Sequence, residues 1–224
     1  MPSLRQLLAT HSTILLIDSA SACVQVAILR RDTKPVWSVK PGEAGEQVFL
    51  GVNDVLALAG IDLDAVDAFI FCDGPGSVLG IRTTAVALRT WRVVRERPSY
   101  AFCSLTVVAK KIALSDGRRD CAVIADARRD TWHHVAIDAA GTISNLHRLP
   151  TTALSGALVM PEGFRQWTQL PAQVTTVPYS LATLLPPLAE TELFYSAPEP
   201  DAFLHEEPVY KTWTPQVHRA PSPS

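Results

Sequence analysis

The residues best suited to bind an anion lie in the turn Gly74-Pro75-Gly76-Ser77. Its two glycines allow close backbone approach to a ligand, and Ser77 can begin a helix whose first amides attract negative charge. The turn is not a P-loop, because no Lys followed by Ser or Thr stands at the required spacing. The other reading is a tight strand-to-helix turn capped by Ser77. Gly74, Gly76 and Ser77 are therefore candidate contacts for a nucleotide or another anion, and both readings stay open.

A second candidate is Asp18, followed by Ser19, at the end of the apolar run Ile14–Ile17. A carboxylate and a hydroxyl in a turn between two strands could contact a nucleotide. A phosphate-binding turn usually needs glycine, whereas Ala20 and Ser21 follow here. The alternative is a hairpin turn in which Asp18 and the serines bond to nearby backbone.

Among the remaining polar residues we predict no catalytic residue and no metal site. His133 and His134 are adjacent, so on a strand they point to opposite faces and cannot bind one ion together. The spacing Gly-x-Ser-x-Gly is not found: Gly76 to Gly80 does not fit it. Asp126 and Arg128 could form a site, although a solvated turn between strands is the simpler reading. Four cysteines stand far apart without a Cys-x-x-Cys spacing, which predicts free thiols in a reducing compartment.

The composition is that of a globular chain without a nucleic-acid-binding surface. Of 224 residues, 47% are hydrophobic and 19% are charged, and the formal net charge is −2. A strong direct contact with tRNA or DNA is not expected at this charge. No apolar stretch approaches the roughly 20 residues that cross a bilayer, and the first residues lack a signal layout. We expect a cytoplasmic protein that does not enter the membrane.

The hydrophobic pattern predicts an α/β fold of two lobes. Helices are expected over residues 44–59, 78–95 and 105–114. Strands are expected over residues 13–17, 23–29, 36–39, 68–72, 100–103, 121–124 and 131–137. A meander of strands followed by alternating helices and strands is typical of a mixed sheet covered by helices, as in the ribonuclease H-like lobes of the actin, Hsp70 and sugar-kinase (ASKHA) superfamily.

The predicted division has residues 1–104 as the first lobe and residues 105–224 as a smaller second lobe. Prolines interrupt the pattern repeatedly beyond Gly141, so the order of elements there stays open. Residues 220–224 are expected to form a frayed tail.

The chain resembles the TsaB (YeaZ) family, whose members are needed to make threonylcarbamoyladenosine in tRNA. Four stretches carry the resemblance over roughly residues 13 to 137, and 208–210 weakly echoes a motif near the carboxyl end. The four are Ile14-Leu15-Leu16-Ile17-Asp18-Ser19-Ala20-Ser21, residues 59–67, Gly74-Pro75-Gly76-Ser77 with Gly80 and Arg82, and Asp126-Ala127-Arg128. The chain departs from the family pattern at Val78-Leu79, which replace Phe-Thr, at Gly45-Glu46-Gln47, where a His is expected, and at Thr131, where many members carry Glu.

The resemblance implies a non-catalytic scaffold for N6-threonylcarbamoyladenosine (t6A37) formation in tRNA. Such proteins bind a TsaD-like catalytic subunit, here through helices 44–59 and 78–95, with a TsaE-like ATPase joining the complex. It implies a homodimer when the partner is absent, tRNA contact only through the complex, and no cofactor beyond weak or interfacial ATP or ADP. Two alternatives stay open: a self-associating paralogue of the fold, and an ATP-binding enzyme of the ASKHA superfamily.

The partner-binding residues are expected on the apolar and small stripes of these two helices. In the first helix the apolar stripe includes Val48, Val52 and Leu56, and in the second the small side chains would let another backbone approach closely. Arg82 could pair with an acidic group of the partner or of its own lobe. The other reading is that the small stripe packs against the chain's own sheet. The residues expected in the second helix are Gly80, Arg82, Thr84 and Ala87.

Overall fold

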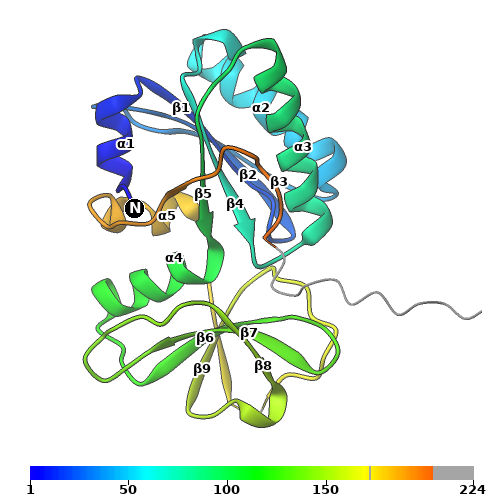
Figure 1. The fold of residues 1–224 in the computed structure, drawn as a ribbon, viewed down its shortest axis with the longest axis vertical. Coiled ribbons are helices and arrows are strands. Elements are labelled where there is room, and N and C mark those ends of the chain that lie inside the picture. The colour runs from blue at the N-terminus through cyan, green and yellow to red at the C-terminus, as the bar shows by residue number, and fades with distance from the viewer. Residues whose placement is uncertain (172, 204–224) are drawn as a thin grey trace, which may run out of the picture.

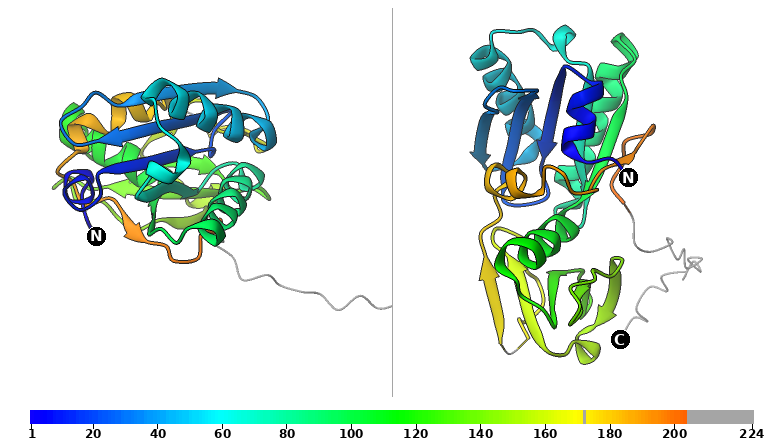
Figure 2. Two further views of the ribbon diagram at one scale, coloured as in Figure 1. Left: turned by 90° about the horizontal axis from the view of Figure 1, so that it is seen from above. Right: turned by 90° about the vertical axis from the view of Figure 1, so that its left-hand side faces the viewer.

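The computed structural model describes residues 1–171 and 173–203. It contains two sheets, with helix α4 (Ser104–Lys111) lying between them in Figures 1 and 2. The weak motif at 208–210 and the tail expected over residues 220–224 lie outside the described residues. No helix of the described part combines the length and apolar character that a membrane crossing requires.

The first sheet has six strands in the order β11-β5-β4-β1-β2-β3. β1, β2 and β3 form an antiparallel meander, and β4 and β5 run parallel to β1. Because β1 and β4 are parallel neighbours, Asp18 and the Gly74–Ser77 turn meet at one edge of the sheet. The strands are β1 (Thr13–Asp18), β2 (Cys23–Arg30), β3 (Val36–Pro41), β4 (Ala68–Gly74), β5 (Ser99–Cys103) and β11 (Tyr195–Ser196).

Helices α2 (Ala44–Ala59) and α3 (Val78–Val94) lie side by side on one face of this sheet (Figure 1). α2 ends at Gly60, whose φ of 64° is left-handed, and the Ile61 amide then bonds to the Leu56 carbonyl at 3.1 Å. α3 begins after Ser77, whose hydroxyl accepts the Gly80 amide at 3.3 Å. Both predicted helices are therefore confirmed, together with their stop and start signals.

The opposite face is covered by α1 (Leu4–Thr10), α4 and α5 (Leu181–Leu184). One continuous apolar core on this side joins the two lobes, since it includes Leu16 and Phe102 of the first sheet, Val108 of α4, and Val123 and Val159 of the second sheet. Beyond α4 the chain makes one turn of π-helix, Ile112–Asp116. The two lobes thus share a hydrophobic interior.

The second sheet has five strands in the order β10-β9-β6-β7-β8. β6 and β7 confirm two predicted strands, and the other three lie in the proline-rich part where no order was predicted. They are only four or five residues long and lie among prolines, so their local pattern is weak. The strands are β6 (Cys121–Asp126), β7 (Thr131–Ile137), β8 (His147–Pro150), β9 (Ala157–Pro161) and β10 (Val174–Val177).

After β10 the chain returns to the first lobe, which differs from the predicted division at residue 104. The Leu181 amide donates to Gln25 Oε1 at 2.8 Å, and β11 pairs with β5. Residues 181–203 therefore complete the first lobe instead of the second. Helix α1 was not predicted either, although Ser3 and Gln6 form a capping box that marks its start.

Candidate functional site

Asp18 lies completely buried at the end of β1, where a nucleotide contact was a possibility. The Ala20 amide donates to its Oδ1 at 2.8 Å, and the Tyr179 hydroxyl donates to Oδ2. Burial raises the pKa of the Asp18 carboxyl to about 6, although these two hydrogen bonds lower it. Tyr179 comes from the segment between β10 and α5, so the returning chain covers the carboxylate that would have faced a phosphate or a cation.

The glycines of the candidate anion turn make close contacts with the Ser19–Ala20 backbone. A Cβ at Gly76 would stand 2.4 Å from the Ala20 carbonyl oxygen, and one at Gly80 would stand 2.3 Å from the Ser19 carbonyl oxygen. The Ser77 amide donates to the Ala20 oxygen at 2.7 Å. Gly74 is buried beside Ile81 with a left-handed φ of 135°. Glycine is needed at Gly76 and Gly80 because two turns of the chain touch there and leave no room for a Cβ. This is the arrangement expected of a tight strand-to-helix turn.

The small residues of α3 face inward. The Thr84 hydroxyl and the Ser19 hydroxyl lie 2.7 Å apart in a buried hydrogen bond, and Ala87 is buried as well. In α2, Val48 and Val52 are buried in a core against the sheet, with Leu56 packed at its edge. These predicted partner contacts are thus occupied by the chain's own sheet and turn, whereas Arg82 is exposed. A partner lying on α2 and α3 would meet other residues.

The outward side of α3 carries an alternating row of apolar and basic side chains. Leu79, Val86 and Val93 follow one another at intervals of seven and are 67%, 53% and 87% exposed. The two exposed arginines between them continue the three- and four-residue spacing that defines one helical face. We call the residues Leu79, Arg82, Val86, Arg89 and Val93 the outer stripe.

α2 also exposes apolar side chains. Phe49, Leu50 and Leu58 are exposed large hydrophobic residues of that helix, and the Phe49 ring meets the Trp91 ring of α3 edge-on at 6.3 Å between centroids. Phe49 therefore faces α3, whereas Leu58, nine positions further on, lies on the opposite side of α2. Composition alone did not single out these residues. The seven-residue interval of Leu79, Val86 and Val93 was visible in the sequence, but the small-residue stripe beside it gave the stronger signal for close packing.

A small cavity of about 120 Å³ separates the start of α3 from the turn between β6 and β7. Asp126 is buried there and accepts the backbone amides of Arg128, Trp167 and Thr168 at 2.6 to 2.7 Å. Burial raises the pKa of Asp126, but the three amides outweigh burial and the net shift is downward. Asp126 therefore organises the loops around it. The Arg128 guanidinium lies 4.3 Å from the Trp167 ring centre, which is a cation–π contact.

In the part of the chain that the structure describes, the histidines and cysteines form no cluster of metal ligands. In the antiparallel pair β7–β8, His133 stands opposite Arg148 and His134 opposite His147. Among the described residues no group of three or more His, Cys, Asp or Glu side chains is placed to hold an ion. All four cysteines are free thiols, two of them buried and two partly exposed.

Comparisons with known proteins agree with this fold. A family model described as TsaD, tRNA N6-adenosine threonylcarbamoyltransferase, matches residues 46–155. No curated protein matches the sequence. The solved structure of YeaZ from Pseudomonas aeruginosa is similar at 22% identity and a TM-score of 0.59, over 78% of this chain and 89% of that one.

A second solved structure, of a protein with similarity to peptidase YeaZ from Pseudomonas aeruginosa, has the same identity and coverage and a TM-score of 0.58. At this level of identity the likeness establishes the fold. The predicted two-lobed α/β architecture is confirmed, and so is the resemblance to the YeaZ fold that the motifs indicated.

Proposed function

We propose that this chain is a non-catalytic subunit of a system that forms N6-threonylcarbamoyladenosine in tRNA. It binds a TsaD-like catalytic subunit through the outer stripe of α3 and the exposed Phe49 and Leu50 of α2. The outer stripe is the observation that carries the proposal, and the likeness to YeaZ and the match to the TsaD family model support the system in which it acts.

The exposed apolar side chains favour a helical partner. A helix that buries one side against its own sheet and exposes Leu79, Val86 and Val93 on the other has a second hydrophobic seam. Side chains at intervals of three, four and seven pack into the grooves of another helix. With α2 beside α3, two helices of the partner would complete a four-helix bundle.

The two arginines of the outer stripe indicate the chemistry of the partner surface. Arg82 and Arg89 are exposed at positions between the apolar residues. Carboxylates on the facing helices would pair with them and fix the register of the bundle, while the valines and the leucine supply the burial. Because the net charge of this chain is −2, contact with tRNA is assigned to the assembled complex and not to this subunit.

The closed state of the Asp18 turn supports a non-catalytic role. Tyr179 covers the carboxylate, and the Ser77 amide is engaged by the Ala20 carbonyl. No phosphate can reach these groups without displacing the contacts between the two turns. A TsaE-like ATPase in the same complex would supply the nucleotide chemistry that this chain leaves out.

The test is binding of the purified chain to the TsaD-like protein of the same organism, followed by size-exclusion chromatography and calorimetry. Val86→Glu places a charge at the centre of the outer stripe, and we expect at least a tenfold loss of affinity, about 1.4 kcal/mol or more. The matched control is Leu114→Glu, because Leu114 is 63% exposed on the turn after α4 and should leave binding unchanged.

The two alternatives are distinguished by this experiment together with a titration of the isolated chain with ATP and magnesium. No complex at micromolar concentration, together with a dimer that Val86→Glu dissociates, would identify a self-associating chain. Tight binding of ATP with magnesium by the isolated chain would contradict the closed Asp18 turn and favour an enzyme. Equal effects of the two glutamate substitutions would remove the outer stripe as the docking surface.

A further inference from the structure

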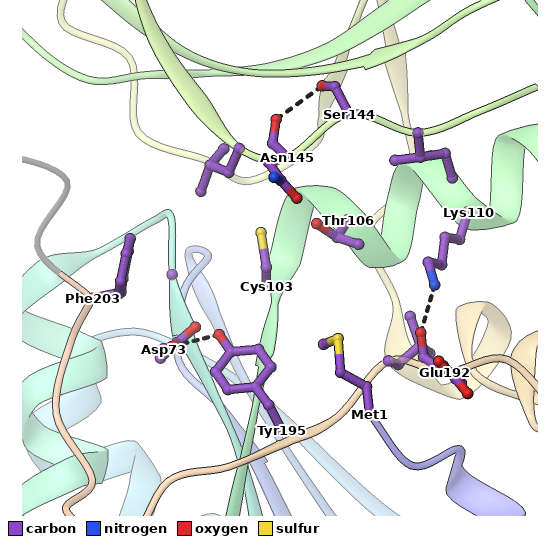
Figure 3. Close-up of a pocket in the computed structure, with 14 residues that line it drawn as sticks. Met1, Asp73, Cys103, Thr106, Lys110, Ser144, Asn145, Glu192, Tyr195 and Phe203 are labelled. Carbon is purple, nitrogen blue, oxygen red and sulfur yellow. Dashed lines mark hydrogen bonds between the residues drawn. The ribbon is translucent and has the colours of Figure 1, made fainter.

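A cavity of about 480 Å³ lies between the two lobes, beside β5 (Figure 3). Its size falls in the range of small-molecule sites, which span roughly 300 to 1,000 Å³. Its lining comes from the end of β4, from β5 and α4, from the loop between β7 and β8, and from the returning chain. A ligand held here would therefore contact both lobes.

Two of the three charged side chains that line the cavity lie together. The Lys110 ammonium donates to the main-chain carbonyl of Glu192. Burial lowers the pKa of Lys110, and the negative charge of the nearby Glu192 carboxylate partly offsets this effect. Both side chains lie at the same end of the cavity in Figure 3. Their opposite charges therefore balance each other there.

The third charged side chain, Asp73, has a different environment. It is 7% exposed, and its Oδ2 accepts the Tyr195 hydroxyl at 2.6 Å. Within the described part of the chain, no Lys, Arg or His side chain forms an ion pair with it. Burial raises the pKa of Asp73 to about 6 and also raises the pKa of the neighbouring Cys103 thiol. At neutral pH the carboxylate is therefore mostly ionised and the thiol is not, so the cavity holds one uncompensated negative charge, at Asp73.

Aromatic residues adjoin Asp73 on both sides. The Phe203 amide donates to the Asp73 main-chain carbonyl at 2.8 Å, and the Tyr195 hydroxyl donates to its carboxylate. Figure 3 shows the two rings flanking the Asp73 side chain. An aromatic ring attracts an organic cation through its negative face. A buried carboxylate between two aromatic residues is thus a combination that suits a positively charged organic ligand.

The remaining lining offers apolar surface to the body of such a ligand. Ile143 and Leu146 come from the loop of the second lobe, and Leu193 comes from the returning chain. Thr106 and Asn145 add polar groups that carry no charge. An apolar body held against these side chains is removed from water together with them, which favours binding.

We propose that this cavity binds an organic primary ammonium ion, with the ammonium group on the Asp73 carboxylate and an apolar body in the rest of the cavity. A primary ammonium has three N–H donors, and a carboxylate that accepts one hydroxyl retains acceptor positions for them. A single positive charge neutralises the cavity, because the charges of Lys110 and Glu192 already balance. An anionic ligand would instead bring a second negative charge to Asp73.

The experiment is calorimetric titration of the full chain at pH 7.5 with hexylamine, 1-hexanol and hexanoate. The three probes have the same number of carbons, and only hexylamine carries a positive charge at this pH. We expect hexylamine to bind at least tenfold more tightly than either of the others. This comparison uses the unaltered protein and does not depend on whether a variant folds.

Two results of this titration would overturn the proposal. Equal binding of the three probes would show apolar contact without charge recognition. Failure to detect hexylamine binding at 5 mM, several times the dissociation constant of roughly 1 mM that a weak site has, would show that the cavity is not a site for this class of ligand.

Two substitutions locate the carboxylate that holds the ammonium. Asp73→Asn keeps an acceptor for the Tyr195 hydroxyl and should weaken hexylamine at least tenfold. Glu192→Gln removes the other carboxylate of the lining and should change binding less than threefold, because Glu192 is exposed and lies beside Lys110. Equal losses with the two variants, or no loss with Asp73→Asn, would also overturn the proposal. The result is independent of the partner-binding proposal, since no residue of the outer stripe lines this cavity.

Discussion

At the scale of single residues, the structure explains two carboxylates by burial. Asp18 and Asp73 end the parallel neighbours β1 and β4, and each accepts a hydrogen bond from a tyrosine of the returning chain. A carboxylate held in this way is expensive to ionise, because burial disfavours its charge more than the hydrogen bonds favour it. Both carboxyls therefore keep their protons to a higher pH in the folded protein than they would in water.

This burial predicts a pH dependence of stability carried by Asp18. Its pKa rises from 3.8 to about 6 on folding, so the folded state binds more protons between these values. Its contribution is therefore fully present below pH 3.8 and is lost as the pH rises through 6. A shift of about two units corresponds to roughly 3 kcal/mol.

Asp18→Asn does not titrate and keeps an acceptor for the Ala20 amide. Relative to the unaltered chain, this variant should gain stability as the pH rises from 4 to 7.5, measured by urea denaturation at a series of pH values. The exposed Asp62→Asn variant is the control and should follow the unaltered chain. A difference between Asp18→Asn and the unaltered chain that stays constant with pH would contradict the assignment.

At the scale of elements, the contact of the Gly74–Ser77 turn and α3 with the Ser19–Ala20 turn fixes where α3 lies. At Gly80 the opposing atom is a backbone carbonyl oxygen, which cannot rotate away as a side chain could. The buried hydrogen bond between Ser19 and Thr84 lies one helical turn further on. The inner side of α3 is therefore specified by the backbone of a segment some sixty residues earlier.

Two glycine-to-alanine substitutions separate packing from helix propensity. Gly80→Ala should lower the free energy of unfolding by about 2 to 4 kcal/mol, because its Cβ would lie 2.3 Å from the Ser19 oxygen. Gly45→Ala in the first turn of α2 has nothing within 4 Å and should be neutral or stabilising by up to about 1 kcal/mol. Thermal and urea denaturation measure both. Similar effects at the two positions would show that α3 does not depend on this contact.

The elements that could be predicted from the sequence were those whose start or stop is marked by a nearby residue. α2 has its stop at Gly60 and α3 its cap at Ser77, and both were predicted to within a residue. The direction in which the α3 stripe faces was not determined by local pattern, because it depends on where the Ser19 turn lies in space. β8, β9 and β10 are only four or five residues long, and β9 pairs with β6 and not with the strand before it, which explains why the proline-rich part could not be ordered. The contact of Tyr179 with Asp18 could not be predicted either, because the two residues are far apart in the sequence.

At the scale of the whole molecule, the returning chain makes the two lobes one unit. Phe194 is fully buried and its ring meets Phe102 edge-on at 6.1 Å between centroids, in the core that also contains Val123 of the second sheet. A core shared in this way should unfold cooperatively.

Phe194→Ala leaves a large cavity in this core and should cost about 3 to 5 kcal/mol. Because the core is continuous, we expect hydrogen exchange of β1 in the first lobe and β6 in the second to accelerate by similar factors, as read by mass spectrometry. Acceleration confined to the first lobe would mean that the two lobes unfold separately.

The continuous interior around α4 also limits how the protein can move. Two-lobed enzymes grip their substrates by rotating about a hinge, which requires a joint that opens without exposing much apolar surface. Here such a rotation would pull Phe102 and Val159 away from the helix between them. The architecture therefore favours a stiff body that presents a constant shape to whatever lies against it.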